Sequence, residues 1–125
     1  MAKKIFISGK ITGDPNYIEK FAKMEAELKK LDQDYIVLSP ICLPEGMEWN
    51  DYMQITLAMV KVADAVLLLP DWQESKGAKL EESFARNQQK KIFYPVTEED
   101  AEEEITEDAA DNENAAPETP NRNDD

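Results

Sequence analysis

The sequence predicts an α/β domain in which helices cover a small parallel sheet of four to five strands. Four short β-rich apolar runs alternate with helical patterns along residues 3–96, and no hairpin signal joins any two of them. Parallel strands need crossover connections, so this βαβαβαβ order implies right-handed crossovers with helices on the sheet faces.

The predicted strands occupy residues 3–9, 35–40, 64–70 and 90–96. The first run ends at a glycine and the second at a proline, residues that commonly end a regular element. The third run, DAVLLLP, is the most continuous apolar stretch of the chain. Such continuity is typical of a parallel strand, so we expect both faces of this strand to be covered.

The first helix is predicted to start with Asp14 as its N-cap and Pro15 at the first helical position. Apolar side chains then recur at spacings of 4, 3, 4 and 3 residues, which places them on one stripe of a helix. The stripe consists of Tyr17, Phe21, Met24, Leu28 and Leu31.

Two further helices are predicted over about residues 50–62 and about residues 78–89. Asn50 or Asp51 is expected to cap the second helix. The apolar face of the second helix consists of Tyr52, Ile55, Met59 and Val62. The side chains of the third helix that are expected to face the sheet are Leu80, Phe84 and Ala85.

Charge is distributed unevenly along the chain. Residues 97–125 hold 13 acidic side chains against the single base Arg122, whereas residues 1–96 hold 14 acidic and 13 basic side chains. With Ile105 as its one large aliphatic residue, the tail cannot bury enough apolar surface to offset the entropy cost of ordering. We therefore expect a folded domain over residues 1–96 and a disordered acidic tail over 97–125. The tail is either a solubilising extension or a phosphate mimic for a basic partner.

The residue inventory excludes several kinds of chemistry. Cys42 is the only cysteine and the chain has no histidine. These counts exclude an internal disulfide, a multi-thiolate zinc site, His-ligated metals and His-activated nucleophiles. We expect no metal and no cofactor, so any reaction must use carboxylates, lysine, tyrosine or backbone groups.

The N-terminal apolar run is too short for a signal peptide, and no stretch approaches the roughly 20 apolar residues of a membrane span. We therefore expect a cytoplasmic protein with no membrane partner. The absence of a basic excess argues against a nucleic-acid polymer as partner. A small sheet leaves an exposed edge, which self-association would cover, so we expect a homo-oligomer.

Three glycine-containing loops follow the predicted strands, at residues 9–13, 41–49 and 71–78. Ligands of an open parallel sheet bind outside the carboxyl ends of its strands, where these loops gather. The third loop leads into a helix N-terminus, whose N–H groups and dipole favour a phosphate or carboxylate. Ser75, Lys76 and Gly77 would bind that anion; alternatively, Ser75 or Gly77 only caps the helix.

Two carboxylates lie in the first turns of the third helix. Glu82 is expected to pair with Arg86 across an exposed face at spacing i+4. Glu81 should point along the top of the sheet toward the loop after the first strand. With no histidine in the chain, Glu81 is the best-placed nucleophile or base, although helix stabilisation alone would also explain a carboxylate there.

A longer composite pattern resembles a known superfamily. The pattern is ISG-ITGDP, then PEGM-W-DYM, then ADAVLLLP-W-SKGAKLE, followed by Ala85 and the KI pair at 91–92. It resembles the nucleoside 2-deoxyribosyltransferase superfamily and, within it, a phage and bacterial branch classed as a domain of unknown function, over essentially all of residues 3–96. Its spacing is similar to that of the 2′-deoxynucleoside 5′-monophosphate N-glycosidases.

The resemblance implies a flavodoxin-like three-layer sandwich and oligomers with active sites near subunit contacts. The implied reaction cleaves the N-glycosidic bond of a deoxynucleoside or its 5′-phosphate, with Glu81 attacking the anomeric carbon. Ser75 and Gly77 would hold the 5′-phosphate or hydroxyl, and the loop 9–13 would line the sugar and base. The substrate-binding positions indicated in this way are Gly9, Lys10, Ile11, Gly13, Ser75, Gly77 and Ala78.

The sequence departs from the N-glycosidase pattern at several positions, among them Lys10 and Thr12, which stand where those enzymes have polar residues after the loop glycine. Phe6 stands where those enzymes have a tyrosine in the first strand, and Thr56 stands where they have a helix aspartate that assists the reaction. Asp51 is one candidate to replace that aspartate. Three hypotheses therefore stand together: an N-glycosidase or deoxyribosyltransferase acting through Glu81, a catalytically weak module that binds or sequesters nucleotides, and an interaction adaptor that uses the acidic tail.

Two tryptophans follow predicted strands. Trp49, together with Met47, is either a lid that stacks on a base or a hydrophobic plug that anchors its loop. Trp72 is either a wall of the pocket or an oligomer contact.

Overall fold

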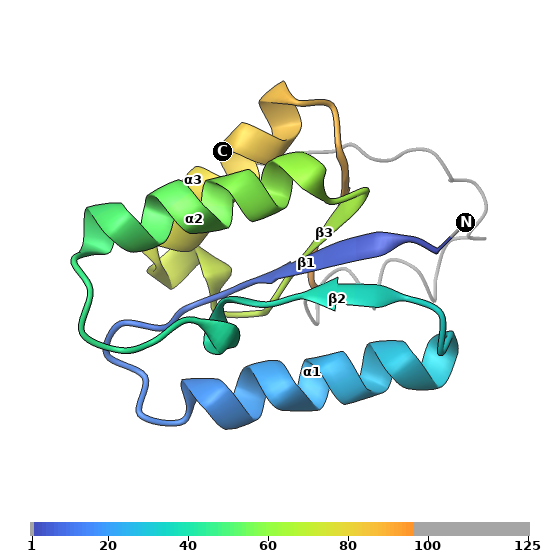
Figure 1. Ribbon diagram of the computed structural model, residues 1–125, viewed down its shortest axis with the longest axis horizontal. Coiled ribbons are helices and arrows are strands. Elements are labelled where there is room, and N and C mark those ends of the chain that lie inside the picture. The colour runs from blue at the N-terminus through green and yellow to red at the C-terminus, as the bar shows by residue number, and fades with distance from the viewer. Residues whose placement is uncertain (1, 97–125) are drawn as a thin grey trace. The chain divides into compact units, whose positions relative to one another are not determined.

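The computed structural model describes residues 2–96, which form a sheet of four parallel strands flanked by three α-helices (Figure 1). The strands pair in the order β2-β1-β3-β4. Their bounds are β1 (Lys4–Ser8), β2 (Ile36–Leu38), β3 (Ala65–Leu68) and β4 (Lys91–Phe93). Each strand lies inside its predicted run, and the predicted α/β class with a parallel sheet is confirmed. The predicted tail, residues 97–125, lies outside the described residues.

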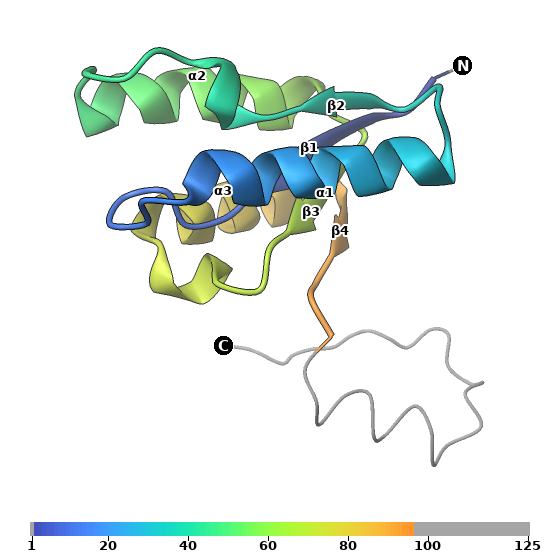
Figure 2. The ribbon, with the colours of Figure 1, turned by 90° about the horizontal axis from the view of Figure 1, so that it is seen from below.

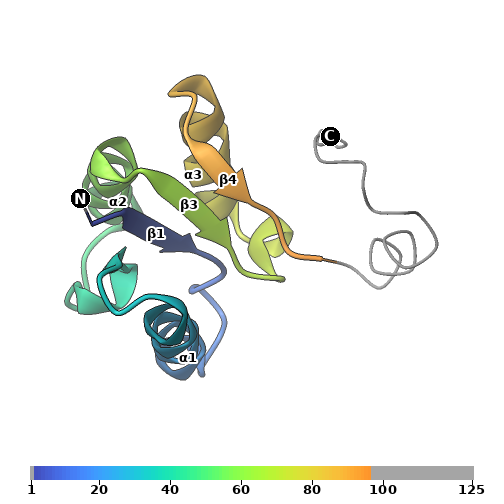
Figure 3. The same ribbon diagram turned by 90° about the vertical axis from the view of Figure 1, so that its right-hand side faces the viewer.

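The helices cover both faces of the sheet. They are α1 (Tyr17–Leu31), α2 (Trp49–Val62) and α3 (Lys76–Asn87), and two short 3₁₀ turns, η1 (Pro40–Cys42) and η2 (Trp72–Glu74), lie in the loops after β2 and β3. Figure 3 shows α1 on one side of the sheet and α2 with α3 on the other. The chain therefore forms a three-layer sandwich.

Alternating side chains of β1 supply the two cores. Ile5 and Ile7 pack with Phe21 and Leu28 of α1. On the other face, Phe6 packs with a cluster from α2, β3 and α3 that includes Val60, Val66 and Ala85. This period-two division follows from the strand geometry, because successive side chains of a strand point to opposite faces.

The strand order creates a switch point beside β1. The chain passes from β1 to β2 at one side and then crosses back to β3 at the other side of β1. The loops that leave β1 and β3 therefore diverge at the carboxyl end of the sheet, where open α/β sheets bind ligands. Figure 2 shows the segments after β1, β2 and β3 gathered at the left-hand end of the molecule.

Helix α1 begins later than its sequence signals predict. Asn16 occupies the N-cap position, and Asp14 bonds the backbone N–H of Asn16 through its Oδ1 at 2.9 Å. The predicted capping by Asp14 and Pro15 is therefore wrong, because Asp14 stabilises a turn that precedes the helix. At the other end, Leu31 is 77% exposed, so the buried stripe stops at Leu28.

Helix α2 buries a different face from the predicted one. Met53, Thr56 and Val60 are buried, whereas Ile55 and Val62 of the predicted apolar face are exposed. The N-cap position is held by Glu48 rather than by Asn50 or Asp51. The helix begins at Trp49, so both predicted caps lie within its first turn.

Helix α3 is capped by Ser75, whose Oγ accepts a hydrogen bond from the backbone N–H of Ala78 at 3.0 Å. Leu80, which was expected to face the sheet, is 41% exposed, whereas Ala85 is fully buried. Glu82 pairs with Arg86 as predicted, but the predicted exposed face is wrong, since Glu82 is only 7% exposed.

Candidate functional site

A cavity of about 610 Å³ opens at the carboxyl end of the sheet. Its walls come from the loop after β1, the segment from η1 to the start of α2, one side of α2, and the N-terminal half of α3. These segments are far apart in sequence and meet there because the carboxyl ends of parallel strands share one edge. The cavity has the concave form and size of a small-molecule site.

Glu81 is the buried carboxyl of this cavity. It is 6% exposed, and the Ser8 hydroxyl at the end of β1 donates a hydrogen bond to its Oε1 at 2.6 Å. Burial raises the pKa of Glu81 to about 7, while hydrogen bonds from the Ser8 and Thr56 hydroxyls act in the opposite direction. Near neutral pH this group is therefore close to half-ionised, which suits a nucleophile or a proton carrier.

The N-terminal turn of α3 packs tightly against α2. A Cβ placed on Gly77 would lie 3.2 Å from Met53 Sδ and 3.6 Å from Trp49 Nε1, so a larger residue there would require the Met53 side chain to shift by a few tenths of an ångström. The Lys76 ammonium lies 4.9 Å from the centroid of the Trp49 ring, a cation–π contact. Trp49 thus lines the cavity and anchors α3 at the same time.

Two tyrosines shape the opposite wall. The Tyr52 hydroxyl donates to the carbonyl of Pro44 at 2.6 Å and accepts from the backbone N–H of Met47 at 3.1 Å. Tyr17 hydrogen-bonds Glu45, and burial together with the Glu45 charge raises the pKa of Tyr17 above its usual value. These contacts hold the loop between η1 and α2 over the cavity.

Of the predicted binding positions, Ile11, Ser75, Gly77 and Ala78 line the cavity together with Glu81. Gly9, Lys10 and Gly13 do not line it. Gly9 is packed against Leu69, and Gly13 adopts a positive φ of 83° in the turn at the end of the loop. These two glycines therefore have a structural role: they allow close packing and a positive φ that a larger residue would disfavour.

The remaining predictions around the site have separate outcomes. Trp72 is absent from the cavity wall and packs against Tyr94, with ring centroids 6.0 Å apart. Asp51, the candidate replacement for a helix carboxylate, is exposed and does not line the cavity. Met47 holds its loop through its backbone and also lies outside the cavity lining.

Sequence patterns alone did not indicate Tyr17, Glu45 and Tyr52 as site residues. Tyr17 and Tyr52 fall on the apolar stripes of two helices, and that periodicity favoured a role in the core. Glu45 lies in the PEGM segment of the composite pattern, to which the resemblance assigned no site residue. Only the arrival of three separate segments at one cavity brings these side chains together.

Two further features concern other classes of site. Among residues 2–96, no group of three or more acidic or cysteine side chains is arranged to hold a metal ion, and no helix is long and apolar enough to cross a membrane.

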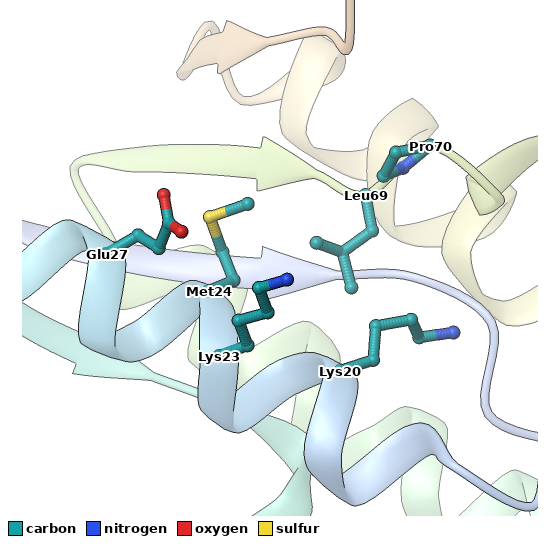
Figure 4. A pocket seen from close by; sticks show the side chains of 6 residues that line it. All are labelled: Lys20, Lys23, Met24, Glu27, Leu69 and Pro70. Atoms are coloured by element: carbon teal, nitrogen blue, oxygen red, sulfur yellow. The ribbon is translucent and has the colours of Figure 1, made fainter.

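A second hollow, of about 380 Å³, lies between α1 and the end of β3 (Figure 4). Its lining residues are Lys20, Lys23, Met24, Glu27, Leu69 and Pro70.

Comparison with known proteins supports the fold. The chain shares its fold with a 2-desoxiribosyltransferase from Leishmania mexicana, with a TM-score of 0.58 and 19% sequence identity over 74% of this chain and 63% of that protein. The chain thus spans less than two thirds of that protein's length, and no curated protein matches it. Residues 3–94 match the model of a family described as a domain of unknown function, DUF4406. With its family model covering nearly the whole folded domain, the chain belongs to the DUF4406 family.

Proposed function

We propose that this domain binds a nucleoside or nucleotide in the cavity at the carboxyl end of the sheet and cleaves or transfers its base through Glu81. Glu81 carries this proposal, because its carboxyl group is almost fully buried, faces the cavity and has a pKa raised to about 7. The fold shared with a 2-desoxiribosyltransferase supports the same class of ligand.

The reaction follows from the chemistry of a carboxylate beside a sugar. An ionised oxygen of Glu81 bonds to the anomeric carbon as the bond from that carbon to the base nitrogen breaks. The base leaves with the bonding electron pair and takes up a proton. Water, or a second base, then displaces the carboxylate from the sugar and restores Glu81. A buried carboxylate also stabilises the positive charge that develops on the sugar.

The decisive experiment incubates the protein with a panel of deoxy- and ribonucleosides and their 5′-monophosphates and measures the release of free base. We expect Glu81→Gln to lower base release by at least about 10³-fold, because the amide cannot act as the nucleophile. Glu82→Gln is the matched control, since Glu82 is the buried carboxylate next to Glu81 on α3 but lies outside the cavity wall. The absence of base release from every compound, or equal release by Glu81→Gln, contradicts the proposal.

A specific observation favours a second function, binding without turnover. The groups that hydrogen-bond Glu81 are the hydroxyls of Ser8 and Thr56, and Asp51 lies outside the cavity wall. General acid–base help from a second carboxylate is worth roughly 10²–10⁴-fold in rate, so its loss favours a module that binds or sequesters nucleotides. In calorimetric titrations with the same panel, tight binding without base release supports this function, and no binding contradicts both.

We also propose that the domain forms a homo-oligomer. Helix α2 leaves Ile55 and Val62 exposed, and Leu80 of the adjacent α3 is exposed as well. A second copy that packed on these side chains would remove apolar surface from water. Light scattering should give a molar mass of at least twice that of one chain, and Ile55→Glu should lower it. A monomer at concentrations of about 100 μM contradicts this proposal.

A further inference from the structure

We infer that Lys20 and Asp71 are positioning residues for the cavity, holding the loop after β1 in the shape that forms one of its walls. They belong to a group of charged side chains at the carboxyl end of the sheet, here named the rim cluster. The rim cluster consists of Lys20 of α1, Asp14 of the turn before α1, and Asp71 of the loop after β3. Neither Lys20 nor Asp71 lines the cavity.

Lys20 joins three segments of the chain. Its ammonium group donates hydrogen bonds to Asp14 Oδ2, to Asp71 Oδ2 and, at 2.8 Å, to the carbonyl oxygen of Lys10. An ammonium group has three N–H donors, so each donor has a partner. Figure 4 shows the Lys20 side chain extending from α1 toward the end of β1, below Leu69.

Asp71 completes the connection to the loop after β1. Its second oxygen, Oδ1, accepts a hydrogen bond from the backbone N–H of Lys10 at 3.0 Å. Both backbone polar groups of Lys10 are therefore bound by the rim cluster, the carbonyl by Lys20 and the N–H by Asp71. Two charged groups thus specify the orientation of the two peptide planes that flank this residue.

This arrangement matters for the cavity because Ile11 and Thr12, the next residues, form part of its wall. On the other side of Lys10, Gly9 is packed so closely that a Cβ there would lie 2.7 Å from Leu69 Cδ1. The loop is therefore held against the end of β3 before Lys10, and the rim cluster determines its direction after Lys10.

The rim cluster is shielded enough for its charges to interact strongly. The side chains of Lys20 and Asp71 are each 24% exposed, and that of Asp14 is 21% exposed. Burial lowers the pKa of Lys20, but the two carboxylates outweigh it and raise that pKa, while hydrogen bonding to Lys20 lowers the pKa of Asp14. Removing Asp71 leaves the backbone N–H of Lys10 and one donor of the Lys20 ammonium without their partners.

A matched control exists at the opposite end of the sheet. Asp64 accepts a hydrogen bond from the backbone N–H of Lys4 at 2.8 Å and pairs with the Lys4 ammonium at 3.7 Å. Asp64 and Asp71 thus each tie β1 to β3 through a backbone N–H and a lysine. Only Asp71 does so beside the cavity, so Asp64→Ala removes a comparable set of contacts without affecting the cavity wall.

The test measures amide hydrogen exchange of the full chain for wild type, Asp71→Ala, Lys20→Met and Asp64→Ala. We expect exchange in residues 10–12 to accelerate about 10-fold or more in Asp71→Ala and Lys20→Met, while exchange in β3 stays unchanged. Asp64→Ala should accelerate exchange at Lys4 and leave residues 10–12 as in wild type. Lys20→Arg, which keeps the cation, should restore part of the protection. Unchanged exchange at 10–12 in Asp71→Ala, or equal acceleration there in Asp64→Ala, overturns the inference.

A kinetic readout rests on the proposed function. With whichever nucleoside or nucleotide releases base, Asp71→Ala should raise KM about 10-fold and change kcat by less than about threefold, because the loop binds the ligand without touching the reacting atoms. An unchanged KM overturns the positioning role. If no compound on the panel is cleaved, the proposed function fails, and the exchange measurement still decides the inference by itself.

Discussion

At the scale of single residues, the ionisation of Glu81 governs both the chemistry and the stability of the domain. A carboxyl group whose pKa is higher in the folded chain than in the unfolded chain binds more protons when folded. Its favourable contribution is therefore complete below the unfolded value of about 4.5 and decreases as the pH rises through about 7. A nucleophile needs the ionised carboxylate. Protonation of Glu81 below about pH 7 therefore lowers activity while it stabilises the fold.

The first prediction concerns pH. The free energy of unfolding of the wild type should fall by about 2.5 kcal/mol between pH 5 and pH 8, whereas Glu81→Gln should lack most of this decrease. Among residues 2–96, Glu81 is the carboxyl group whose shifted pKa lies in this range, since those of Asp14 and Asp64 are lowered. Urea unfolding at several pH values provides the measurement, and identical slopes for the two proteins would contradict the assignment.

If the domain is an enzyme, the rate of base release should rise with pH through about 7, as Glu81 ionises. The pH profile of kcat/KM reports this ionisation in the free protein. A flat profile between pH 5.5 and pH 8.5 would contradict the role of Glu81 as nucleophile while leaving its effect on stability intact.

At the scale of elements, α2 shows where sequence periodicity fails. The helix carries one apolar stripe through Tyr52, Ile55, Met59 and Val62 and another set of positions through Met53, Thr56 and Val60. The stripe with more apolar residues was predicted to be the apolar face of the helix, but the structure buries the other set. A helix that is apolar on two sides does not reveal its rotation, because only packing against the sheet and α3 decides which side is covered.

A network between α3 and the residue after β4 holds the edge of the sheet. The Tyr94 hydroxyl donates to Glu82 Oε2 at 2.5 Å, and Arg86 Nε donates to the same oxygen at 2.8 Å. Burial and the neighbouring Glu82 charge raise the pKa of Tyr94, so this hydroxyl stays protonated and keeps its donor. The segment after β4 is thereby fastened to the helix that carries Glu81.

The third prediction tests this network. Tyr94→Phe should lower the free energy of unfolding by about 1–2 kcal/mol, because a buried carboxylate loses a hydrogen bond. Tyr35→Phe is the matched control, since the Tyr35 ring packs against the α1 side of the core and its hydroxyl has no partner within residues 2–96. Chemical denaturation of both variants provides the measurement, and equal losses would contradict the role of the Tyr94 hydroxyl.

At the scale of the whole molecule, local patterns predicted the architecture, and the cavity depended on contacts between distant segments. Each strand and helix has a recognisable pattern within a short stretch of sequence. The alternation of these patterns predicts the parallel sheet. The SKGAKLE motif likewise marked Ser75, Gly77 and Glu81, which all line the cavity. Glu45, Tyr17 and Tyr52 meet at the cavity because α1, α2 and the loop after β2 pack together. No short stretch of sequence contains all three of these segments.

The capping of α3 determines which hydrogen-bonding group Ser75 presents to a ligand in the cavity. The Ser75 oxygen is engaged by the amide of Ala78, yet a hydroxyl that accepts one hydrogen bond retains its own hydrogen. At this point of the cavity wall the Ser75 hydroxyl can donate a hydrogen bond, while the Ala78 amide holds its oxygen in place. A ligand oxygen with a free lone pair, such as an ester, hydroxyl or phosphoryl oxygen, can accept that hydrogen.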